Sequence, residues 1–305
     1  MAALLGGRTA LVTGAGHGIG QAHALELARH GASVVVNDLG SSVSGEGSGR
    51  DADRVVDAIG AMGGTAVADY GDVGDEADAE AMVARAIDAW GRLDILVNNA
   101  GIVRDRAIWN MEAGDFDAVM RVHVRGSWLT SRAAARHWRQ RAKSGDAMAG
   151  RIINTTSGAG LQGNFGQSNY ATAKAALTGL TLTLSVELAS IGCTANLIGP
   201  GALTRLSATT GLPDPTEPLD LDPDDWSEFD PRMSSPVVAW LASEASAGVS
   251  GQCFRVMGEN LHWMQGWREH VTISNGGQHW DATVLARTLE TDVFGTRAPG
   301  LRLGG

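Results

Sequence analysis

Short apolar runs alternate with stretches of helical periodicity through the first two-thirds of the chain. The apolar runs predict strands, and the amphipathic stretches predict helices. Six strands are expected in this part, at Thr9–Thr13, Ser33–Asn37, Thr65–Ala68, Ile95–Asn98, Arg151–Thr155 and Thr194–Ile198. The helices expected between them are Gly18–Arg29, Arg50–Met62, Asp75–Trp90, Asp115–Arg141 and Asn169–Ile191. Such regular alternation predicts a parallel sheet with helices on both faces.

Parallel strands linked through helices need right-handed crossovers, and these favour a doubly wound sheet. A short helix at Pro236–Ser243 and a strand at Cys253–Val256 extend the pattern. The predicted fold is therefore α/β, a Rossmann-type doubly wound parallel sheet of about seven strands with helices on both faces. We assign residues 1–257 to this domain and residues 258–305 to a C-terminal extension that packs on the domain or on a partner subunit.

The alternation stops between residues 201 and 235, where Pro, Asp and Thr are frequent and no period is visible. A loop of this length in a compact domain is usually functional. Because it follows the sixth strand, it lies at the carboxyl edge of the sheet, where ligands bind in such folds. We expect a substrate loop here, with a passive insertion as the alternative. Further on, three tryptophans could pack on the domain, on a partner subunit or near the substrate: Trp263, Trp267 and Trp280.

The chain has 305 residues, enough for one large α/β domain, and a net charge of −10. Such an acidic chain argues against a nucleic-acid partner, because binding to phosphates depends on Lys and Arg. Two cysteines, Cys193 and Cys253, indicate no disulfide framework, and we expect both to be buried and unreactive. There is no His/Cys spacing for a metal, no signal peptide, and no apolar run of the roughly 18–20 residues that cross a bilayer. We therefore expect a cytoplasmic protein without metal or membrane contact.

A glycine-rich turn joins the first strand to the first helix, in the sequence Thr13-Gly14-Ala15-Gly16-His17-Gly18-Ile19-Gly20. A dinucleotide pyrophosphate approaches the backbone N–H groups at a helix N-terminus, and small residues allow that approach. The spacing is Gly-x-x-x-Gly-x-Gly, not Gly-x-Gly-x-x-Gly, and a glycine cluster alone is weak evidence. Its place between a strand and a helix predicts cofactor binding by Gly14, Gly16, His17, Gly18, Ile19 and Gly20.

Asp38 ends the second strand, eighteen residues after Gly20. A carboxylate at this place accepts hydrogen bonds from the adenosine ribose hydroxyls and repels a 2′-phosphate. Its neighbours Asn37, Leu39 and Gly40 offer no cation for such a phosphate. The sequence therefore predicts NAD rather than NADP, the alternative being that Asp38 is a plain loop residue at a strand end.

Two further segments follow the third and fourth strands, Asp72-Val73 and Asn98-Asn99-Ala100-Gly101. Both fall at the carboxyl edge of the sheet, which faces the cofactor in such folds. The cofactor-binding residues predicted here are Asp72, Val73, Asn99, Ala100 and Gly101. The alternative for Asn98 and Asn99 is a structural one, in which their side chains cap backbone groups after the strand.

Tyr170 and Lys174 lie four residues apart on a predicted helix, so their side chains share one face. Ser157 lies thirteen residues before Tyr170. Oxidation of an alcohol needs a base for the hydroxyl proton, and a tyrosine with a pKa of about 10 is a poor base near neutral pH. A neighbouring ammonium lowers that pKa, and a serine hydroxyl can hold the reacting oxygen. A Tyr-x-x-x-Lys pair alone is usually structural, so the prediction depends on the combination with Ser157, the glycine turn, Asn98–Gly101 and Pro200-Gly201.

Together these motifs resemble the short-chain dehydrogenase/reductase family, over the stretch from Arg8 to Val256. The matching residues are the turn glycines Gly14, Gly18 and Gly20, the element Asn98 to Gly101, and the triad Ser157, Tyr170 and Lys174. The resemblance implies that Tyr170 and Lys174 also contact the cofactor, the lysine at the nicotinamide ribose. It further implies that residues around the Pro-Gly turn hold the carboxamide, by position the Ile198-to-Pro200 backbone, Gly201 and Thr204.

Several stretches are similar to one subgroup of this family, the dehydrogenase domain of peroxisomal multifunctional enzyme type 2. They are Asn37-Asp38-Leu39-Gly40 with its glycine-rich insertion, Arg104-Asp105-Arg106, Arg121 to Ser127, Gly163 to Gln167 and Ser235 to Gly251. This resemblance implies NAD-dependent oxidation of a (3R)-hydroxyacyl-CoA or a 17β-hydroxysteroid.

One position departs from the family pattern. Most members place a catalytic asparagine in the long helix before the fifth strand, where it holds a water that relays protons from the lysine. The surrounding Arg121–Ser127 stretch puts His123 at that place. A histidine can also relay a proton, so His123 joins the catalytic candidates, with a merely packed histidine as the alternative.

The sequence thus predicts an NAD-dependent oxidoreductase that converts a secondary alcohol, an acyl-CoA or a steroid, into a ketone. One alternative is an NADPH-dependent 3-ketoacyl reductase, and another is a non-catalytic NAD(H)-binding partner subunit. The resemblance implies pairing through helices that match Asp115–Arg141 and Asn169–Ile191, hence a homodimer or homotetramer. Arg104 and Arg106 either contact an acidic group such as a CoA phosphate or are solvated surface arginines.

Overall fold

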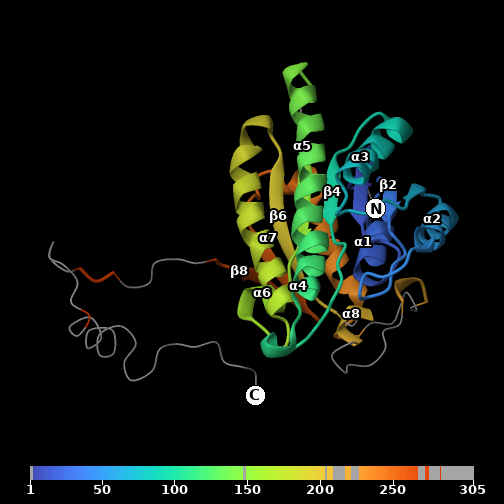
Figure 1. Ribbon diagram of the computed structural model, residues 1–305. Helices are drawn as coiled ribbons and strands as arrows, with labels where there is room; N and C mark the ends of the chain where they lie inside the picture. The colour runs from blue at the N-terminus through green and yellow to red at the C-terminus, as the bar shows by residue number, and fades with distance from the viewer. Residues whose placement is uncertain are drawn as a thin grey trace. The chain divides into compact units, whose positions relative to one another are not determined.

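The strands form one sheet that runs through the middle of the molecule (Figure 1). The computed structural model describes residues 3–146, 149–202, 205–208, 217–220, 227–266, 272–274 and 282. Within them eight strands have the order β3-β2-β1-β4-β5-β6-β7-β8, the first seven parallel and the last antiparallel. Their bounds are β1 Thr9–Thr13, β2 Ser33–Asn37, β3 Thr65–Asp69, β4 Ile95–Asn98, β5 Arg151–Thr155, β6 Thr194–Gly201, β7 Cys253–Met257 and β8 Asn260–Met264.

Helices cover both faces of this sheet (Figure 1). The α-helices in the described residues are α1 Gly18–Arg29, α2 Asp51–Ala61, α3 Glu76–Trp90, α4 Ala113–Met120, α5 Ser127–Lys143, α6 Gly158–Gln162, α7 Ser168–Glu187, α8 Arg205–Ala208 and α9 Ser235–Leu241. The strand order reverses between β1 and β4, which is the switch point of a doubly wound fold. The predicted Rossmann-type architecture is confirmed.

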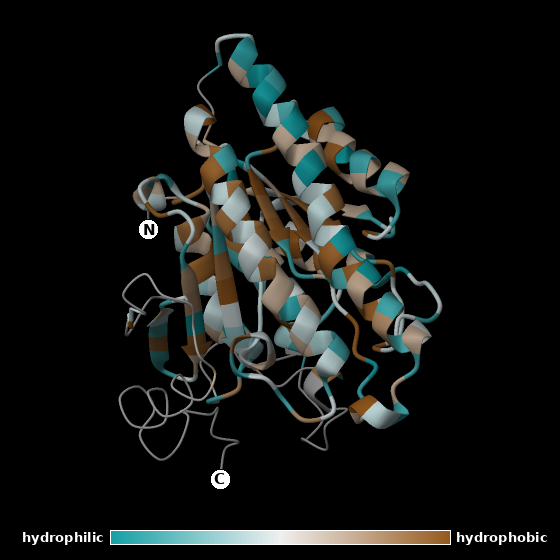
Figure 2. Ribbon diagram, turned by 60° about the vertical axis from the view of Figure 1, so that its left-hand side comes forward, coloured by the Kyte–Doolittle hydropathy of each residue, from teal (hydrophilic) through white to brown (hydrophobic). Residues whose placement is uncertain are grey.

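Two cores lie on opposite sides of the sheet because successive strand residues point to opposite faces. In β1, Val12 belongs to the core under α1, α2 and α9, whereas Leu11 belongs to the core under α3, α5 and α7. Figure 2 shows largely apolar strands that lie between helices in which apolar and polar residues are mixed. Each fully buried Leu, Ile or Val contributes about 1.5–3 kcal/mol relative to exposure. Burial on both faces explains why these strands appear as continuous apolar runs in the sequence.

The eighth strand, β8, was not predicted from the sequence. It pairs with β7 in an antiparallel hairpin at the edge of the sheet. Residues 260–263 are exposed, Leu261 and Trp263 by 56% and 62%, so the strand buries neither face. The segment is also only five residues long, and its polar–apolar alternation is too short to be distinctive. The predicted domain end at residue 257 falls inside this hairpin, and the compact unit that holds the sheet spans Met1–Met264. Trp267 and Trp280 lie outside the described residues.

The single long helix predicted for Asp115–Arg141 is divided. Helix α4 ends at Met120, a π-helical turn spans Arg121–Gly126, and α5 begins at Ser127. A π turn inserts extra backbone into an otherwise regular pattern, which periodicity does not reveal, and such turns are frequent at functional sites. This one contains His123.

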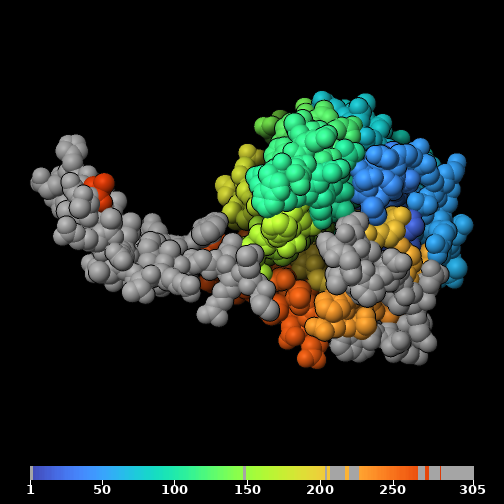
Figure 3. Space-filling view, turned by 60° about the horizontal axis from the view of Figure 1, so that its bottom comes forward, coloured from blue at the N-terminus to red at the C-terminus, as the bar shows by residue number. Residues whose placement is uncertain are grey.

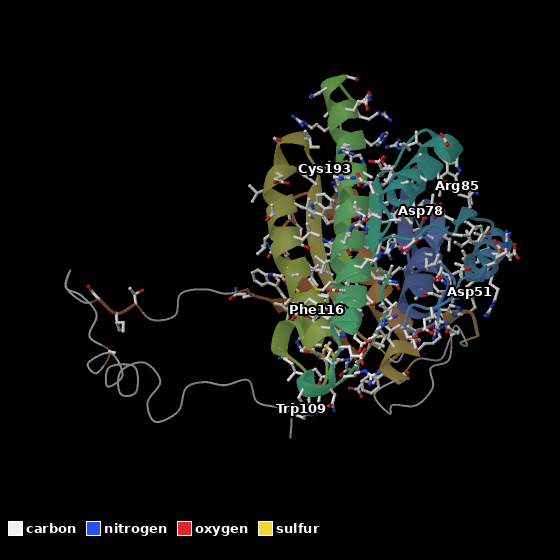
Figure 4. The ribbon with its side chains drawn as sticks, viewed as in Figure 1. Asp51, Asp78, Arg85, Trp109, Phe116 and Cys193 are labelled. Carbon is white, nitrogen blue, oxygen red and sulfur yellow. The ribbon has the colours of Figure 1, made fainter. Side chains whose placement is uncertain are left out.

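Both cysteines are free thiols, as expected. Cys193 directly precedes β6 and is buried, and Cys253, the first residue of β7, is half-buried (Figure 4 labels Cys193). Burial raises the pKa of both thiols, that of Cys253 to about 11, so both stay protonated near pH 7. No helix in the described part of the chain is long and apolar enough to cross a bilayer.

Candidate functional site

A cavity of about 380 Å³ opens at the carboxyl ends of the parallel strands. Figure 3 looks toward this end, where segments from the beginning, middle and later parts of the chain meet. Most residues of the predicted site line it: Gly14, His17, Gly18, Ile19, Gly20, Asp38, Asp72, Val73, Asn99, Ala100, Gly101, His123, Ser157, Tyr170, Lys174 and Pro200. Gly16 and Gly201 are not among the lining residues. Thr204 lies outside the described residues.

The turn after β1 brings backbone segments unusually close together. Gly14 has φ +62°, and a Cβ at this position would lie 2.7 Å from Ala100 Cα. A Cβ on Gly20 would lie 2.1 Å from the Gly14 carbonyl oxygen. Asn99 fixes the turn from the end of β4, because its Nδ2 donates to the carbonyl oxygens of Thr13 and Gly14 at 3.1 and 3.0 Å. The structural role that the sequence left open for Asn99 is therefore observed, alongside its place in the cavity lining.

Asp38 is held against this turn by both of its carboxylate oxygens. Oδ2 accepts the Gly16 N–H at 2.8 Å, and Oδ1 accepts the Gly40 N–H at 2.7 Å. A Cβ on Gly16 would lie 2.8 Å from Asp38 Oδ2, so only glycine allows this approach. Asp38 is thus a fixed acidic group at the edge of the cavity rather than a free loop side chain.

Ser157, Tyr170 and Lys174 come together in the same cavity. Ser157 follows β5 and caps helix α6, its Oγ accepting the Ala159 N–H at 3.3 Å. Tyr170 and Lys174 share one face of α7, with Lys174 Nζ 5.6 Å from the centre of the tyrosine ring. Lys174 Nζ donates to the Thr155 carbonyl oxygen at 2.7 Å.

Burial dominates the titration of this pair. Burial raises the pKa of Tyr170 to about 12, a hydrogen bond with Ser157 lowers it, and the Asp105 carboxylate raises it. Burial lowers the pKa of the Lys174 ammonium to about 7. We expected Lys174 to lower the pKa of Tyr170, and the structure differs. The cause is that loss of water around the phenol dominates, while the ammonium is held at the Thr155 carbonyl.

His123 is buried and stands edge-on to Tyr170, with ring centres 5.3 Å apart at 87°. Its Nε2 lies 2.8 Å from the Ile102 carbonyl oxygen and 3.1 Å from the Ile102 nitrogen. Burial is the main cause, and the charge of Lys174 a smaller one, that together lower the pKa of His123 to about 3, so the ring is neutral near pH 7. The Ile102 backbone engages Nε2, so Nδ1 is the ring nitrogen left to exchange hydrogen bonds with a group in the cavity.

Two buried polar atoms of lining residues have no hydrogen-bond partner in the described part of the chain, His123 Nδ1 and Thr155 Oγ1. Buried polar atoms nearly always have partners, so these two fit contacts to a polar ligand. The turn at the N-terminus of α1 fits a pyrophosphate, and Asp38 fits a ribose. The residues present therefore fit a nicotinamide dinucleotide.

Two charged residues of this region were missed by the sequence reasoning. Arg205, in α8, lines the cavity. Glu217 accepts the Gly18 N–H at 2.8 Å and lies 3.2 Å from His17 Nδ1. Both belong to the stretch from 201 to 235. This stretch has no hydrophobic periodicity, so its sequence does not indicate which side chains lie at the site.

Arg104 and Arg106, left open between a substrate contact and a solvated surface, both lie beside Asp115. Arg104 Nη1 is 3.7 Å and Arg106 Nε is 3.1 Å from its carboxylate. Arg104 Nε also donates to the Ser44 carbonyl oxygen at 2.9 Å, inside the glycine-rich insertion. They join the loops that border the site, and neither lines the cavity.

Comparison with known proteins gives a consistent result. A profile of the short chain dehydrogenase family matches residues 8–211. The chain is 43% identical over 302 residues to the hydroxyacyl-CoA dehydrogenase ChsB1 of Mycobacterium tuberculosis, covering 97% of this chain and 91% of that protein. It is 42% identical over 251 residues to peroxisomal multifunctional enzyme type 2 of Mus musculus, covering 82% of this chain but 31% of that longer protein. The crystal structure of a short chain dehydrogenase from Mycobacterium avium matches with a TM-score of 0.86 and 43% identity, over 99% of both chains.

Proposed function

The chain belongs to the short-chain dehydrogenase family and is an oxidoreductase, and we propose that it uses NAD to oxidise the secondary alcohol of a 3-hydroxyacyl-CoA. The observation that carries the proposal is one cavity lined by the glycine turn, Asp38, and the trio of Ser157, Tyr170 and Lys174. Because the family is one of dehydrogenases, the alternative of a non-catalytic NAD(H)-binding subunit is set aside.

Asp38 supports NAD as the cofactor. Its carboxylate is fixed by the N–H groups of Gly16 and Gly40, at 2.8 and 2.7 Å. A carboxylate held in this way accepts ribose hydroxyls and repels a 2′-phosphate. We expect NADH to bind more tightly than NADPH, and Asp38→Ala to reduce that difference. Equal or tighter binding of NADPH by the unmodified protein would favour the NADPH-dependent reductase instead.

Bound NAD would supply the hydride acceptor, and the residues of this chain handle the substrate oxygen and its proton. In the proposed reaction the C3–H bond of the alcohol breaks and its electron pair leaves with the hydrogen as hydride. The hydroxyl proton passes to the oxygen of Tyr170, and the C–O bond becomes a ketone C=O. Ser157 Oγ holds the reacting oxygen. The products are one ketone, one NADH and one proton.

Lys174 supports the proton transfer. Since burial lowers its pKa to about 7, Nζ can take up or release a proton near neutral pH. A neutral Lys174 can accept the phenol proton of Tyr170, which produces the phenolate that acts as the base. We propose that the neutral ring of His123, edge-on to Tyr170, passes protons onward from this pair.

The substrate class is supported by the name of one relative that matches nearly over its full length. The name of the Mycobacterium tuberculosis protein is hydroxyacyl-CoA dehydrogenase, and this chain spans 91% of its length. The peroxisomal multifunctional enzyme is a longer protein, of which this chain spans 31%. A 3-hydroxyacyl-CoA with a fatty or steroid side chain is therefore the proposed substrate, and a 17β-hydroxysteroid is the alternative.

We also propose a homodimer or homotetramer that assembles through α4, α5 and α7. These helices expose large apolar side chains: Phe116 (labelled in Figure 4), Trp128, Leu182 and Val186. A groove of about 690 Å³ on the same surface is lined partly by Met120, Val124, Trp128 and Leu180. Burial of such side chains between subunits is favourable, so Trp128→Glu should lower the mass measured by light scattering to that of a monomer.

The experiment that tests the proposed function follows absorbance at 340 nm with purified protein, NAD and either (3R)- or (3S)-3-hydroxyacyl-CoA. We expect turnover of one enantiomer, and a much slower reaction with NADP. If protein that binds NADH gives no rise in absorbance with either thioester, the proposed substrate class is contradicted. Steroid alcohols would then be the substrates to test.

A further inference from the structure

The described stretch Glu217–Asp220 is attached to the N-terminal end of α1. Glu217 Oε2 accepts the Gly18 N–H at 2.8 Å, and Oε1 lies 3.2 Å from His17 Nδ1. Two residues further on, the Leu219 N–H donates to Gln21 Oε1 at 3.2 Å. The Leu219 side chain packs against the core under α1, so this attachment is both polar and apolar.

The carboxylate of Glu217 thereby sits at the place that suits a phosphate. The first N–H groups of a helix have no partner within the helix, and the helix dipole attracts negative charge to them. Gly18 and His17 both line the cavity, within the turn that fits a dinucleotide pyrophosphate. The single hydrogen of the Gly18 N–H is already directed at Glu217, and a carboxylate repels a pyrophosphate placed beside it.

The charges around this contact favour an exchange of anions. His17 also lies 3.0 Å from Asp51 (labelled in Figure 4), and Arg205 is close enough to influence both His17 and Glu217. The hydrogen bond with Glu217 is the main cause that raises the pKa of His17, against the effect of burial. Burial raises the pKa of Glu217, but hydrogen bonds from His17 and Gly18 bring it below its usual value. The Glu217 carboxylate is therefore held by His17 and by the helix N-terminus, with the Arg205 guanidinium close enough to influence it.

We propose that Glu217 is an internal competitor of the cofactor pyrophosphate, whose carboxylate must leave Gly18 and His17 before the dinucleotide can bind. Once it has left, His17 and Arg205 face the phosphates in its place. The proposal rests on the dinucleotide binding proposed above.

A purely structural role for Glu217 predicts something different. A carboxylate that only caps α1 stabilises the helix and has no effect on cofactor affinity. Competition instead predicts that loss of Glu217 increases the affinity for the cofactor. The reason is that the apparent dissociation constant equals the intrinsic dissociation constant divided by the fraction of molecules whose site is free. Affinity for NADH therefore separates the two roles.

The test measures dissociation constants of NADH by its fluorescence, and of NAD by calorimetry, for unmodified protein, Glu217→Ala and Glu217→Gln. Glu259→Gln is the control, because it removes the same charge from the exposed turn between β7 and β8. The pKa of His17, followed by NMR, reports the lost contact without any cofactor. The isosteric Glu217→Gln serves if the alanine variant folds poorly.

We expect the Glu217 variants to bind NADH about three- to tenfold more tightly than the Glu259→Gln control, with a lowered His17 pKa. A change of twofold or less, or weaker binding, in variants that show the lowered His17 pKa would overturn the competition and leave cofactor binding intact. Failure of the unmodified protein to bind NADH, NAD or NADPH would instead overturn the proposed function, and this inference with it.

Discussion

The two ends of the parallel strands differ in how their buried charged groups are paired. At the amino end, Asp94 accepts the Thr9 N–H at 2.8 Å and is bonded by Arg92 at 2.8 and 2.7 Å. Arg151 and Arg8 share the Glu244 carboxylate at 3.5 and 2.9 Å. At the carboxyl end, by contrast, the ammonium of Lys174 and the phenol of Tyr170 are buried side by side, and two atoms of cavity-lining residues, His123 Nδ1 and Thr155 Oγ1, have no hydrogen-bond partner in the described residues. The contrast concerns charged groups, since Thr194 Oγ1 at the start of β6 also has no partner there.

The difference shows how one fold separates stability from function. Buried charges that are paired and hydrogen-bonded stay ionised, and removal of one partner alone is costly because it leaves the other charge uncompensated. Buried groups that lack an opposite charge or a hydrogen-bond partner have shifted pKa values and can form further hydrogen bonds. A reaction site uses both properties. We therefore expect substitutions at the amino end to affect stability and substitutions at the carboxyl end to affect activity.

The largest effect should come from Tyr170. Replacement by phenylalanine removes the proton acceptor, so kcat should fall about 10³-fold, within the range typical of a lost acid–base group. Melting temperature and NADH affinity should stay close to those of the unmodified protein. Tyr70→Phe is the matched control, because Tyr70 contacts Arg50 and Asp53 outside the trio. Retention of more than a tenth of kcat in Tyr170→Phe would contradict the assignment.

At the opposite end, Asp94→Asn should affect stability and not catalysis. The variant loses the charge that Arg92 contacts with two hydrogen bonds, and we expect a loss of about 2 kcal/mol in the free energy of unfolding. Asp146→Asn removes an exposed partner of Arg141 and should cost about 0.5 kcal/mol or less. Denaturant unfolding and kcat, measured on the same samples, check both values. A fall in kcat in folded Asp94→Asn would break the comparison between the two ends.

The pH dependence of oxidation should report the Tyr170–Lys174 pair. The pKa of Lys174 is about 7, so the pair loses one proton near this pH. The pair with one proton lost includes the microstate in which Tyr170 is a phenolate and Lys174 is protonated. The base must be free of its proton, so kcat/KM should rise with pH through an apparent pKa near 7. In Lys174→Met this rise should move to higher pH. A profile of the unmodified protein that rises only above pH 9 would show that Lys174 takes no part.

An effect that is absent at neutral pH and develops only in acid concerns His23, a buried histidine that does not line the cavity. Burial lowers its pKa from 6.5 to about 3, so the folded state resists protonation that the unfolded state accepts. Stability is complete above pH 6.5 and is lost as the pH falls toward 3, by up to about 1.4 kcal/mol per pH unit. His23→Gln should reduce this acid sensitivity without a change in kcat, whereas His30→Gln on the same helix should not. Identical acid unfolding curves would count against a buried neutral His23.

Much of the fold could be predicted because its strands are buried on both faces. The runs at Leu11 and Val35 have no polar interruption, and glycines mark the turns that follow. Strand β8 and the π turn around His123 escaped prediction for physical reasons. The former buries neither face, and the latter differs from an α-helix only in its hydrogen-bond pattern.

The residues of the site likewise divide into those that could be predicted from the sequence and those that could not. Gly14, Asp38 and the trio of Ser157, Tyr170 and Lys174 could be found because each occupies a fixed distance from a predicted strand or helix. Glu217 could not, since its contact with Gly18 spans 199 residues of sequence and begins in a stretch without period. The direction in which the Tyr170 pKa shifts depends on burial, and burial cannot be inferred from the spacing of residues along the chain.

Direct transfer of hydride in this cavity is the central claim, and isotope transfer tests it most directly. The measurement incubates the protein with NAD and 3-hydroxyacyl-CoA that carries deuterium on C3, followed by mass spectrometry of the reduced cofactor. We predict one deuterium in each NADH formed, from one enantiomer only, and none with Tyr170→Phe. Unlabelled NADH, or no NADH from protein shown to bind it, would contradict the account.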